Sequence, residues 1–483
     1  MKVLLFGTGD YYNRYKKWFA SQKVPALLDN SGKKQNTMID GLEVLSPEEG
    51  IKLEYDAIVI LSFYVTEMKR QLVSLGVEEQ KIYHFYDLHR LFGGDRIIRP
   101  MQYYLNAEEL VMSADRMSKV ILLISHDMTL GGPAIALFHA AEVLKKNGYE
   151  VLYASMSDGP LRELLTESDI PCVVDENLQI ATMNEIQWVN SCSLMICNTL
   201  NFHVFLSERD TSVPVIWWLH DAPFFYEGVD RDVIGKVSLE NLRAVTVGKI
   251  PEDAVKEFLP QLTCGRLLYG VADAVRNRKN RKNHVPCRAA KVIRFITIGF
   301  IEERKGQDLL MQAIKRLPKE TVDRCEFFIT GHDATLLGEK IKNESISIGA
   351  VHVTGSVNRE KIHELLENSD VLVCPSRQDP MPTVVSEAMM HAIPCIVSDA
   401  TGTAAYIHKG EDGLVFKTED VQDLMEKIIW CVGNQDKLKR MGQSARKLYE
   451  RYFSMKAFED SFMETVSEAL EREQRRGQAV VRI

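Results

Sequence analysis

The feature that most constrains the fold of this chain is a unit that recurs three times. It consists of a short apolar run, a turn that contains glycine, and a segment of helical length. The apolar runs are residues 2–6, 119–125 and 293–299. Short apolar runs bounded by turn residues are typical of strands buried on both faces, as in parallel sheets. Strands that alternate with helices therefore predict an α/β protein.

Length and composition limit the domain count and the class of protein. At 483 residues the chain is too long for one hydrophobic core, so two or three domains are expected. The net charge of −8 and the pI near 5.9 argue against a nucleic-acid partner. No apolar run approaches the ~20 residues of a membrane span, and Lys2 leads directly into a predicted strand instead of a signal peptide. The nine cysteines form no C-x-x-C pair, which favours reduced thiols in a cytoplasm over disulfides or zinc ligands.

The first unit predicts a small Rossmann-like domain over residues 1–92. Gly7-Thr8-Gly9 follows the first strand, and Asp29 ends the second strand about 20 positions later, as in dinucleotide-binding sites. Tyr12 stands where the third glycine of that pattern belongs, so we favour a tight turn over a bound NAD. The domain resembles small Rossmann-like modules fused to bacterial sugar-modifying enzymes. Residues 93–117 are polar and are interpreted as a linker with one short helix.

The second unit carries two candidate site features. Gly131 and Gly132 lead into a predicted helix at 134–147, where backbone amides without partners can contact a ligand. A plain glycine-rich turn is the alternative. His220 follows the predicted strand at 215–219, and such a histidine is either structural or part of a site. Asp230 and Asp232 spell D-x-D away from any strand end, and we interpret them as solvated charge and not as a metal site.

The segment 369–399 predicts a strand, a polar loop, a helix and a second strand, and its loop lies where open α/β sheets bind ligands. Free amides near Thr383 and Val384, at the start of the helix, can hold a phosphate. Asp379 in the loop and Glu387 in the helix can accept hydrogen bonds from sugar or ribose hydroxyls. The alternative is a solvated aspartate together with a glutamate favoured by the helix dipole.

The pattern P-S-x-x-D-P-x-P-x-x-x-x-E-A-M in this segment resembles the E-x7-E segment of the GT-B family-4 retaining glycosyltransferases. The resemblance extends over roughly residues 118–470. Asp379 replaces the first glutamate of the pattern and Glu387 matches the second. The resemblance implies that Glu387 holds the donor ribose and that Asp379 faces the donor sugar.

Other residues acquire expected roles from the same resemblance. The loop at Gly131 and Gly132 would face the donor phosphate and the acceptor, and His220 would lie beside the transferred sugar. In the segment GFIEERKG, Lys305 and Gly306 match the diphosphate clamp of the family, whereas Phe300 occupies the position of the clamp arginine. The remaining two expectations are that Arg304 is the nearest replacement for that arginine and that Gly355 lies near the nucleotide base.

The resemblance implies a GT-B architecture, two facing Rossmann-like domains, after the small N-terminal one. The expected divisions are 118–275 for the acceptor-side domain, 276–290 for a basic linker, 291–452 for the nucleotide-sugar domain and 453–474 for a helix that packs back on the acceptor-side domain. The basic run could also contact an anionic membrane surface, but the hinge between the two domains must fall there, which favours the linker.

The implied activity is transfer of a sugar from a nucleoside-diphosphate-sugar donor, with retention at the anomeric carbon, to a glycan, glycolipid or protein-linked acceptor. No cofactor and no obligatory metal are expected. The expected location is the cytoplasm, with peripheral contact at the inner face of the membrane as an option. One alternative is a catalytically weakened partner that binds nucleotide-sugar or scaffolds another transferase, which Phe300 and Asp379 favour. An oxidoreductase built on Gly7-Thr8-Gly9 is disfavoured, because no catalytic Tyr/Lys or Cys arrangement accompanies it.

Overall fold

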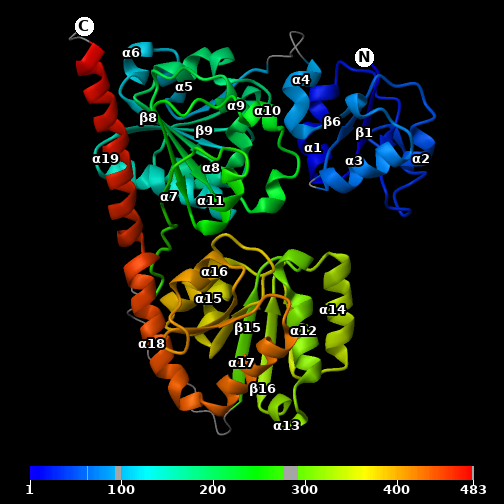
Figure 1. Cartoon of the computed structure of the whole chain (residues 1–483), viewed down its shortest axis with the longest axis vertical. Helices are drawn as coiled ribbons and strands as arrows, with labels where there is room; N and C mark the ends of the chain where they lie inside the picture. The colour runs from blue at the N-terminus through cyan, green and yellow to red at the C-terminus, as the bar shows by residue number, and fades with distance from the viewer. Residues whose placement is uncertain (63, 93–98, 276–291, 481–483) are drawn as a thin grey trace.

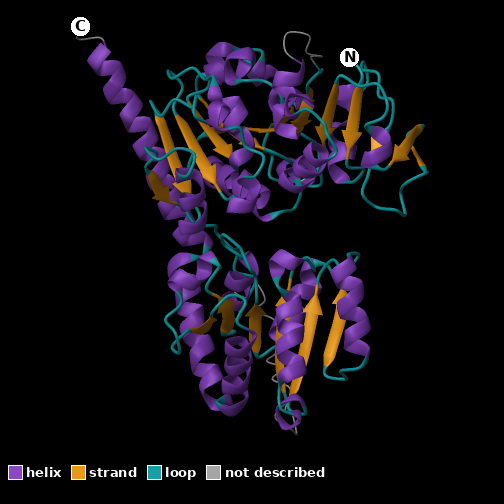
Figure 2. Ribbon diagram, turned by 45° about the vertical axis from the view of Figure 1, so that its right-hand side comes forward, coloured by secondary structure: helices purple, strands orange, loops and turns teal. Residues whose placement is uncertain are grey.

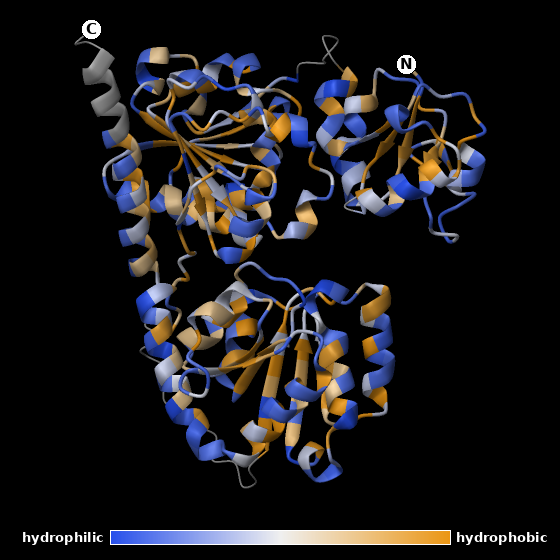
Figure 3. Ribbon diagram, viewed as in Figure 1, coloured by the Kyte–Doolittle hydropathy of each residue, from blue (hydrophilic) through white to orange (hydrophobic). Residues whose placement is uncertain are grey.

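The structure is a computed structural model that describes residues 1–62, 64–92, 99–275 and 292–480. In these residues the chain forms three α/β units, each built on its own sheet. We call them the N-terminal module (residues 1–92), the middle lobe (residues 99–275) and the C-terminal lobe (residues 292–452). Figure 1 shows the module beside the middle lobe, with the C-terminal lobe below. Apolar residues concentrate in the sheets and in the helix faces that cover them (Figure 3).

The N-terminal module has a six-stranded sheet of order β3-β4-β2-β1-β5-β6, which is parallel except for the β3–β4 pair. Gly7 ends β1 with φ 108°, and a Cβ there would lie 2.6 Å from the carbonyl oxygen of Leu61. This turn therefore requires glycine for its own geometry. The strands are β1 (Val3–Phe6), β2 (Leu27–Leu28), β3 (Met38–Ile39), β4 (Leu42–Leu45), β5 (Ala57–Ile60) and β6 (Ile82–His84), and the α-helices are α1 (Asp10–Tyr15), α2 (Pro47–Gly50), α3 (Val65–Ser74) and α4 (Leu88–Phe92).

The middle lobe has an eight-stranded sheet of order β14-β13-β12-β11-β8-β9-β10-β7. Its strands are parallel except β7, which pairs antiparallel with β10. The strands are β7 (Gln102–Tyr104), β8 (Val120–Ser125), β9 (Glu150–Ser155), β10 (Cys172–Val174), β11 (Leu194–Asn198), β12 (Val215–Leu219), β13 (Leu242–Thr246) and β14 (Cys264–Arg266). The α-helices are α5 (Ala107–Val111), α6 (Ala114–Met117), α7 (Gly132–Lys146), α8 (Leu161–Glu167), α9 (His203–Ser207), α10 (Arg231–Ile234) and α11 (Lys249–Lys256).

Strand β7 corrects the prediction that residues 93–117 form a linker. Residues 93–98 lie outside the described part of the chain, but β7, α5 and α6 belong to the middle lobe. Ala107 and Leu110 of α5 are buried in its core. The strand escaped prediction because it is a three-residue edge strand with half-exposed side chains and no apolar run. The basic linker predicted at 276–290 lies outside the described residues.

The C-terminal lobe has a parallel six-stranded sheet of order β17-β16-β15-β18-β19-β20. Its strands are β15 (Ile293–Ile298), β16 (Cys325–Thr330), β17 (Val351–Gly355), β18 (Val371–Cys374), β19 (Cys395–Ser398) and β20 (Gly413–Phe416). Its α-helices are α12 (Gln307–Arg316), α13 (Lys319–Val322), α14 (Leu336–Ile346), α15 (Arg359–Glu367), α16 (Thr383–Met390), α17 (Val421–Gly433) and α18 (Gln435–Tyr452), after which α19 (Met455–Val480) leaves the lobe.

Helix α19 returns to the middle lobe, where it packs against α7 and β12 (Figure 1). The ring of Phe458 stacks on Trp218 with centroids 5.8 Å apart, and both side chains are buried. Val271 donates its N–H to the carbonyl oxygen of Phe453 at 2.8 Å, so the two chain passages between the lobes run side by side. The helix thus joins the two lobes through a buried aromatic contact.

The two lobes face each other through the carboxyl ends of their strands. Figure 2 shows the arrowheads of the lower sheet pointing toward the upper lobe. A Cβ on Gly248, after β13, would lie 3.1 Å from the carbonyl oxygen of Pro380, after β18. The carboxyl ends of parallel strands are where α/β folds bind ligands, so this facing edge is the place to look for a site.

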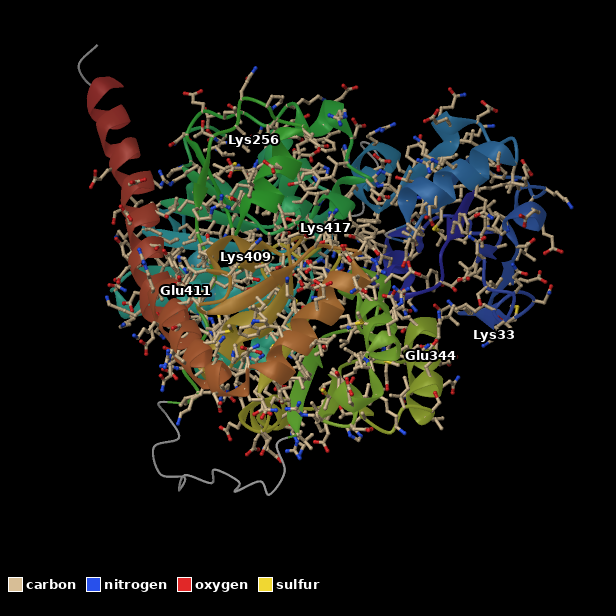
Figure 4. All side chains as sticks on the ribbon, turned by 60° about the horizontal axis from the view of Figure 1, so that its bottom comes forward. Lys33, Lys256, Glu344, Lys409, Glu411 and Lys417 are labelled. Carbon is tan, nitrogen blue, oxygen red and sulfur yellow. The ribbon has the colours of Figure 1, made fainter. Side chains whose placement is uncertain are left out.

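The outer surface carries charges of both signs, and Figure 4 labels Lys33, Lys409 and Glu411 among the exposed examples. Within the described ranges, no helix is both long enough and apolar enough to span a bilayer.

Candidate functional site

The predicted strand–loop–helix segment is present as β18, a loop and α16. Pro382 precedes α16 and its side chain makes no capping hydrogen bond to the first amides of this helix. Thr383 and Val384, the first two residues of α16, are half-buried. A Cβ on Gly132 of the middle lobe would lie 4.0 Å from Cγ2 of Thr383. The glycine loop and the start of α16 therefore face each other across the two lobes.

Lys305 and Asp379 form an ion pair at the same edge of the C-terminal lobe. Nζ of Lys305 lies 2.6 Å from Oδ2 of Asp379, whose residue is only 6% exposed. The backbone of Asp379 is fixed on both sides, because its N–H donates to Ala400 and its carbonyl accepts from Gly402. The two residues are 74 positions apart, and the structure brings them into direct contact.

The position of Lys305 depends on the glycine that follows it. Gly306 has φ 71°, in the left-handed region, and ends the short 3₁₀ turn that carries Lys305. A Cβ at this position would lie 2.0 Å from the carbonyl oxygen of Pro375. Only glycine fits such a close approach to backbone, so this Lys-Gly pair has a structural reason.

Glu387 is nearly fully buried in α16 and pairs with one cation. Its Oε1 lies 2.7 Å from Nη1 of Arg359, at the start of α15, and its side chain is 3% exposed. Burial raises the pKa of Glu387, and the charge of Arg359 opposes part of that rise. The side chain of Arg359 is 71% exposed, so the guanidinium reaches from the surface to the carboxylate. Sequence reasoning assigned no role to Arg359, which carries no signal beyond its place at a helix start.

His220 directly follows β12, and its ring is buried against the ring of Tyr269. Its Nδ1 is 3.0 Å from the hydroxyl of Tyr269, and the two rings stack with centroids 5.2 Å apart. Nε2 of His220 is buried and has no hydrogen-bond partner. Burial lowers the pKa of His220 well below its usual value, so the imidazole is neutral at neutral pH. A neutral ring with one nitrogen already engaged leaves the other available to a ligand.

Tyr269, which the sequence did not single out, follows β14 and engages Nδ1 of His220. Burial, and then the charges of Asp379 and Asp221, raise the pKa of the Tyr269 hydroxyl. His220 and Tyr269 thus form one contacting pair on the middle lobe, and Lys305 and Asp379 form another on the C-terminal lobe. Both pairs follow the carboxyl ends of strands, at the facing edges of the lobes.

Arg304, Gly355 and Phe300, the residue at the clamp position, lie outside these two pairs. Arg304 donates to the carbonyl oxygen of Gln378, in the loop after β18, at 3.2 Å and to Glu302 of its own loop at 2.7 Å, so its guanidinium bridges the two loops. Phe300 is 59% exposed and packs its ring against His332. Gly355 ends β17 with φ 70°, at the carboxyl edge but three strands away from β18. The glycine is required there by its backbone conformation, whatever it contacts.

The loop that carries Gly131 has an internal hydrogen-bond network. Gly131 is the N-cap of α7 and its N–H donates to Oγ1 of Thr129 at 3.3 Å. Thr129 in turn donates its N–H and its hydroxyl to Oδ1 of Asp127, at 3.2 and 2.9 Å. The carboxylate of Asp127 thus organises the turn that leads into α7.

The D-x-D sequence at Asp230 has a structural explanation. Asp230 caps α10 by accepting the N–H of Asp232, and it pairs with Arg90 of the N-terminal module at 3.0 Å. Within the described ranges, no group of three or more histidine, cysteine, aspartate or glutamate side chains is arranged to hold a metal ion.

Family models match all three units. "Glycosyl transferases group 1" matches residues 280–448, "Glycosyl-transferase family 4" matches residues 117–244, and "C2185-like, N-terminal" matches residues 1–83. The pair of facing Rossmann-like lobes and these matches define a GT-B protein. The chain carries glycosyltransferase domains of group 1 and family 4, and it is therefore an enzyme of the glycosyltransferase class.

Relatives and solved structures agree with this assignment. Spore coat protein SA of Bacillus subtilis is 24% identical over 282 residues, which are 53% of this chain and 73% of that protein. Alpha-D-kanosaminyltransferase of Streptomyces kanamyceticus is 23% identical over 286 residues, which are 54% and 72% of the two chains. The structure of Anabaena Alr3699/HepE with UDP and glucose has a TM-score of 0.59 at 17% identity, covering 72% of this chain and 100% of that one. A glycosyltransferase from Rickettsia africae has a TM-score of 0.60 at 15% identity, covering 73% and 98%. These structural likenesses establish the GT-B fold.

Proposed function

We propose that this glycosyltransferase moves a sugar from a nucleoside-diphosphate-sugar to a glycan, glycolipid or protein-linked acceptor, with retention of configuration. The ligands in related structures and the name of one relative support such a donor and acceptor. The Alr3699/HepE structures contain UDP, UDP-glucose, or UDP and glucose. A Campylobacter jejuni transferase that is 41% identical over 85 residues, 22% of its length, is named for a diphospho-undecaprenol acceptor.

The observation that carries the proposal is the contact between Lys305 and Asp379 beside the uncapped start of α16. A donor diphosphate needs cations and N–H donors, and Lys305 and the amides near Thr383 and Val384 supply both. Asp379 can then accept hydrogen bonds from the hydroxyls of the sugar. Thr383 and Glu387 lie one turn apart on α16, so a ribose can reach Glu387 while the diphosphate lies at the helix start.

His220 and Asp379 would hold the transferred sugar from opposite lobes. Nε2 of His220 is an unpaired buried atom on the side of the middle lobe, and Asp379 is a buried carboxylate on the side of the C-terminal lobe. The glycine loop at Gly131 and Gly132 faces the start of α16 and leaves room for backbone to approach the donor. The sugar would be oriented between these groups before the lobes close over it.

In the proposed reaction the bond from the anomeric carbon to the phosphate oxygen breaks, and a bond to the acceptor oxygen forms on the same face. The proton of the acceptor hydroxyl passes to the leaving phosphate. Lys305 stabilises the negative charge that develops on the diphosphate, and Arg359 at the start of α15, which pairs with Glu387, is a second cation near α16. This scheme uses no cofactor and no obligatory metal.

A second candidate is a nucleotide-sugar-binding protein with weakened catalysis. It is favoured by Phe300 in the position of the clamp arginine and by the engagement of Arg304 with Glu302. Under this alternative, donor binding persists while turnover of the donor is absent.

The test measures nucleotide binding and donor hydrolysis with the full chain. UDP and GDP are titrated by calorimetry, and hydrolysis of UDP- and GDP-sugars is followed by nucleotide release. Lys305→Met is expected to weaken binding at least tenfold and to abolish hydrolysis. The control Lys340→Met removes an exposed lysine of α14 and should change neither. Nucleotide binding without turnover by the wild-type protein would support the second candidate, and no binding of either nucleotide would refute both.

A further inference from the structure

The N-terminal module docks on the edge of the middle lobe where the candidate site lies. Its contacts reach the loops that follow the carboxyl ends of four strands, β8, β10, β11 and β12. Figure 1 shows the module, with α1 and α4, lying directly beside that lobe. The contacts pair Arg14 with Asp127, Lys17 with Glu176, Tyr86 with Asn201, and Arg90 with Asp230. The module is therefore placed on the functional edge of the sheet rather than on a remote face.

One of these contacts reaches the glycine loop, which faces the start of α16. Nη2 of Arg14 lies 3.5 Å from Oδ2 of Asp127, while Oδ1 of Asp127 accepts the N–H and hydroxyl of Thr129. The hydroxyl of Thr129 accepts the N–H of Gly131, the N-cap of α7. The two oxygens of the Asp127 carboxylate therefore act differently, because one contacts the module and the other shapes the glycine turn.

The charge of Asp127 is maintained by its surroundings. The residue is 6% exposed, and Nε2 of His126 lies 3.3 Å from Oδ2, the same oxygen that Arg14 meets. Burial acts to raise the pKa of Asp127, but His126, Arg14 and the Thr129 amide together hold it far below its usual range. The ionised carboxylate is an acceptor only, which is what the N–H and hydroxyl of Thr129 require.

We propose that the N-terminal module is a working part of the transferase, in which Arg14 acts as a positioning residue that fixes the glycine loop through Asp127. The loop it fixes carries Gly132, which faces Thr383 at the start of α16. Replacing Arg14 should therefore make the glycine loop beside the donor-binding gap more mobile, although Arg14 itself does not contact the donor. The consequence for ligand binding rests on the proposed function, whereas the effect on the loop does not.

The experiment compares Arg14→Met with Arg90→Met in the full chain. The two arginines are well matched: each pairs with an aspartate of the middle lobe, and each lies 5.8 Å from the centroid of a tyrosine ring. Methionine keeps much of the apolar stem and removes the charge. Asp230, the partner of Arg90, caps α10 and has no part in the glycine loop.

The first measurement is hydrogen exchange of the peptide covering residues 127–133, without ligand. Arg14→Met is expected to speed exchange in this peptide at least tenfold, whereas Arg90→Met leaves it as in the wild type. The second measurement is the affinity for UDP and GDP, which Arg14→Met should weaken about tenfold, as expected when a positioning contact is lost. Arg90→Met should leave that affinity unchanged, although both variants lose similar thermal stability.

The outcomes separate the two proposals. Unchanged exchange in the Arg14→Met loop overturns this inference, whatever the nucleotide affinity. Equal exchange in the two variants also overturns it, because the effect would then be general loosening of the interface. Faster exchange that is confined to Arg14→Met supports the positioning role, and if the wild type binds neither nucleotide, the proposed donor class fails while the positioning role stands.

Discussion

Replacing Glu387 with glutamine removes the charge of the buried carboxylate in α16 and keeps its shape. In the unliganded protein this change should cost little. Burial raises the pKa of Glu387 above its unfolded value, so its ionised form lowers stability at pH values above both. The pair with Arg359 offsets part of this, but an ion pair to a largely exposed cation is worth only about 0–1 kcal/mol. We therefore expect Glu387→Gln to change the free energy of unfolding by less than about 1 kcal/mol at pH 7.

Ligand binding should respond far more strongly to the same change. Hydrogen bonds to a charged group contribute about 1.5–3 kcal/mol each, which corresponds to roughly 10- to 150-fold in affinity. If Glu387 holds the ribose, the wild type should prefer UDP or GDP over the 2′,3′-dideoxy nucleotide by at least about tenfold. Glu387→Gln should reduce this preference several-fold, because the amide oxygen still accepts a hydrogen bond but carries no charge. Calorimetry with the four ligand–protein combinations gives this comparison directly. Glu364→Gln serves as the control, since Glu364 is an exposed residue of α15 that pairs with Lys361.

The reasoning is refuted if Glu387→Gln keeps the wild-type preference for the ribose hydroxyls. A large loss of stability in this variant would instead show that the pair with Arg359 is structural.

Two further predictions concern stability. Burial lowers the pKa of His203 to about 4. Between about pH 6.5 and 4 the ring is therefore neutral in the folded state, whereas the unfolded chain binds a proton. The free energy of unfolding should fall as the pH drops through this window, by an amount on the order of 3 kcal/mol. Thermal unfolding across that pH range should show a smaller fall for His203→Gln, and an equal fall would exclude His203 as the source. Gly306→Ala should destabilise the protein by more than about 1 kcal/mol, because its φ is 71° and a Cβ would lie 2.0 Å from a carbonyl oxygen. The control is Gly433→Ala in α17, where a Cβ would have no heavy atom within 4 Å. In the same thermal melts this change should be neutral or stabilising by up to about 1 kcal/mol. Equal effects of the two substitutions would contradict the argument.

The alternation of strands and helices could be predicted because the central strands are apolar throughout. The strand expected at 215–219 is β12 with the same bounds, since its five side chains are all buried. Strand β14 is Cys264–Arg266, although the apolar pair Leu267 and Leu268, which follows directly, is the more apolar stretch. Leu267 is buried but belongs to the core that joins the lobes and lies outside the strand ladder. Burial alone does not distinguish a strand from a packed loop.

The candidate site could be predicted only as separate pieces. Lys305, Asp379 and Glu387 stand out because each belongs to a local pattern of turn and helix start. Tyr269, Arg359 and Asp127 do not, because their significance comes from partners that are distant in the chain. The roles of all these residues in donor binding remain predictions that the experiments above test.

The ion pair between Lys305 and Asp379 gives a physical reason to expect that the sugar and the diphosphate bind together. In the unliganded protein Lys305 neutralises Asp379. Asp379 is buried, so leaving its charge without a partner would cost free energy. When a diphosphate draws the lysine ammonium toward itself, the carboxylate loses part of that compensation. The hydroxyls of the donor sugar can replace it by charge-assisted hydrogen bonds, whereas a nucleoside diphosphate alone cannot. If the proposed donor binds here, we expect the site to prefer the intact donor over the spent nucleotide, which is the direction that a transferase needs in order to release its product.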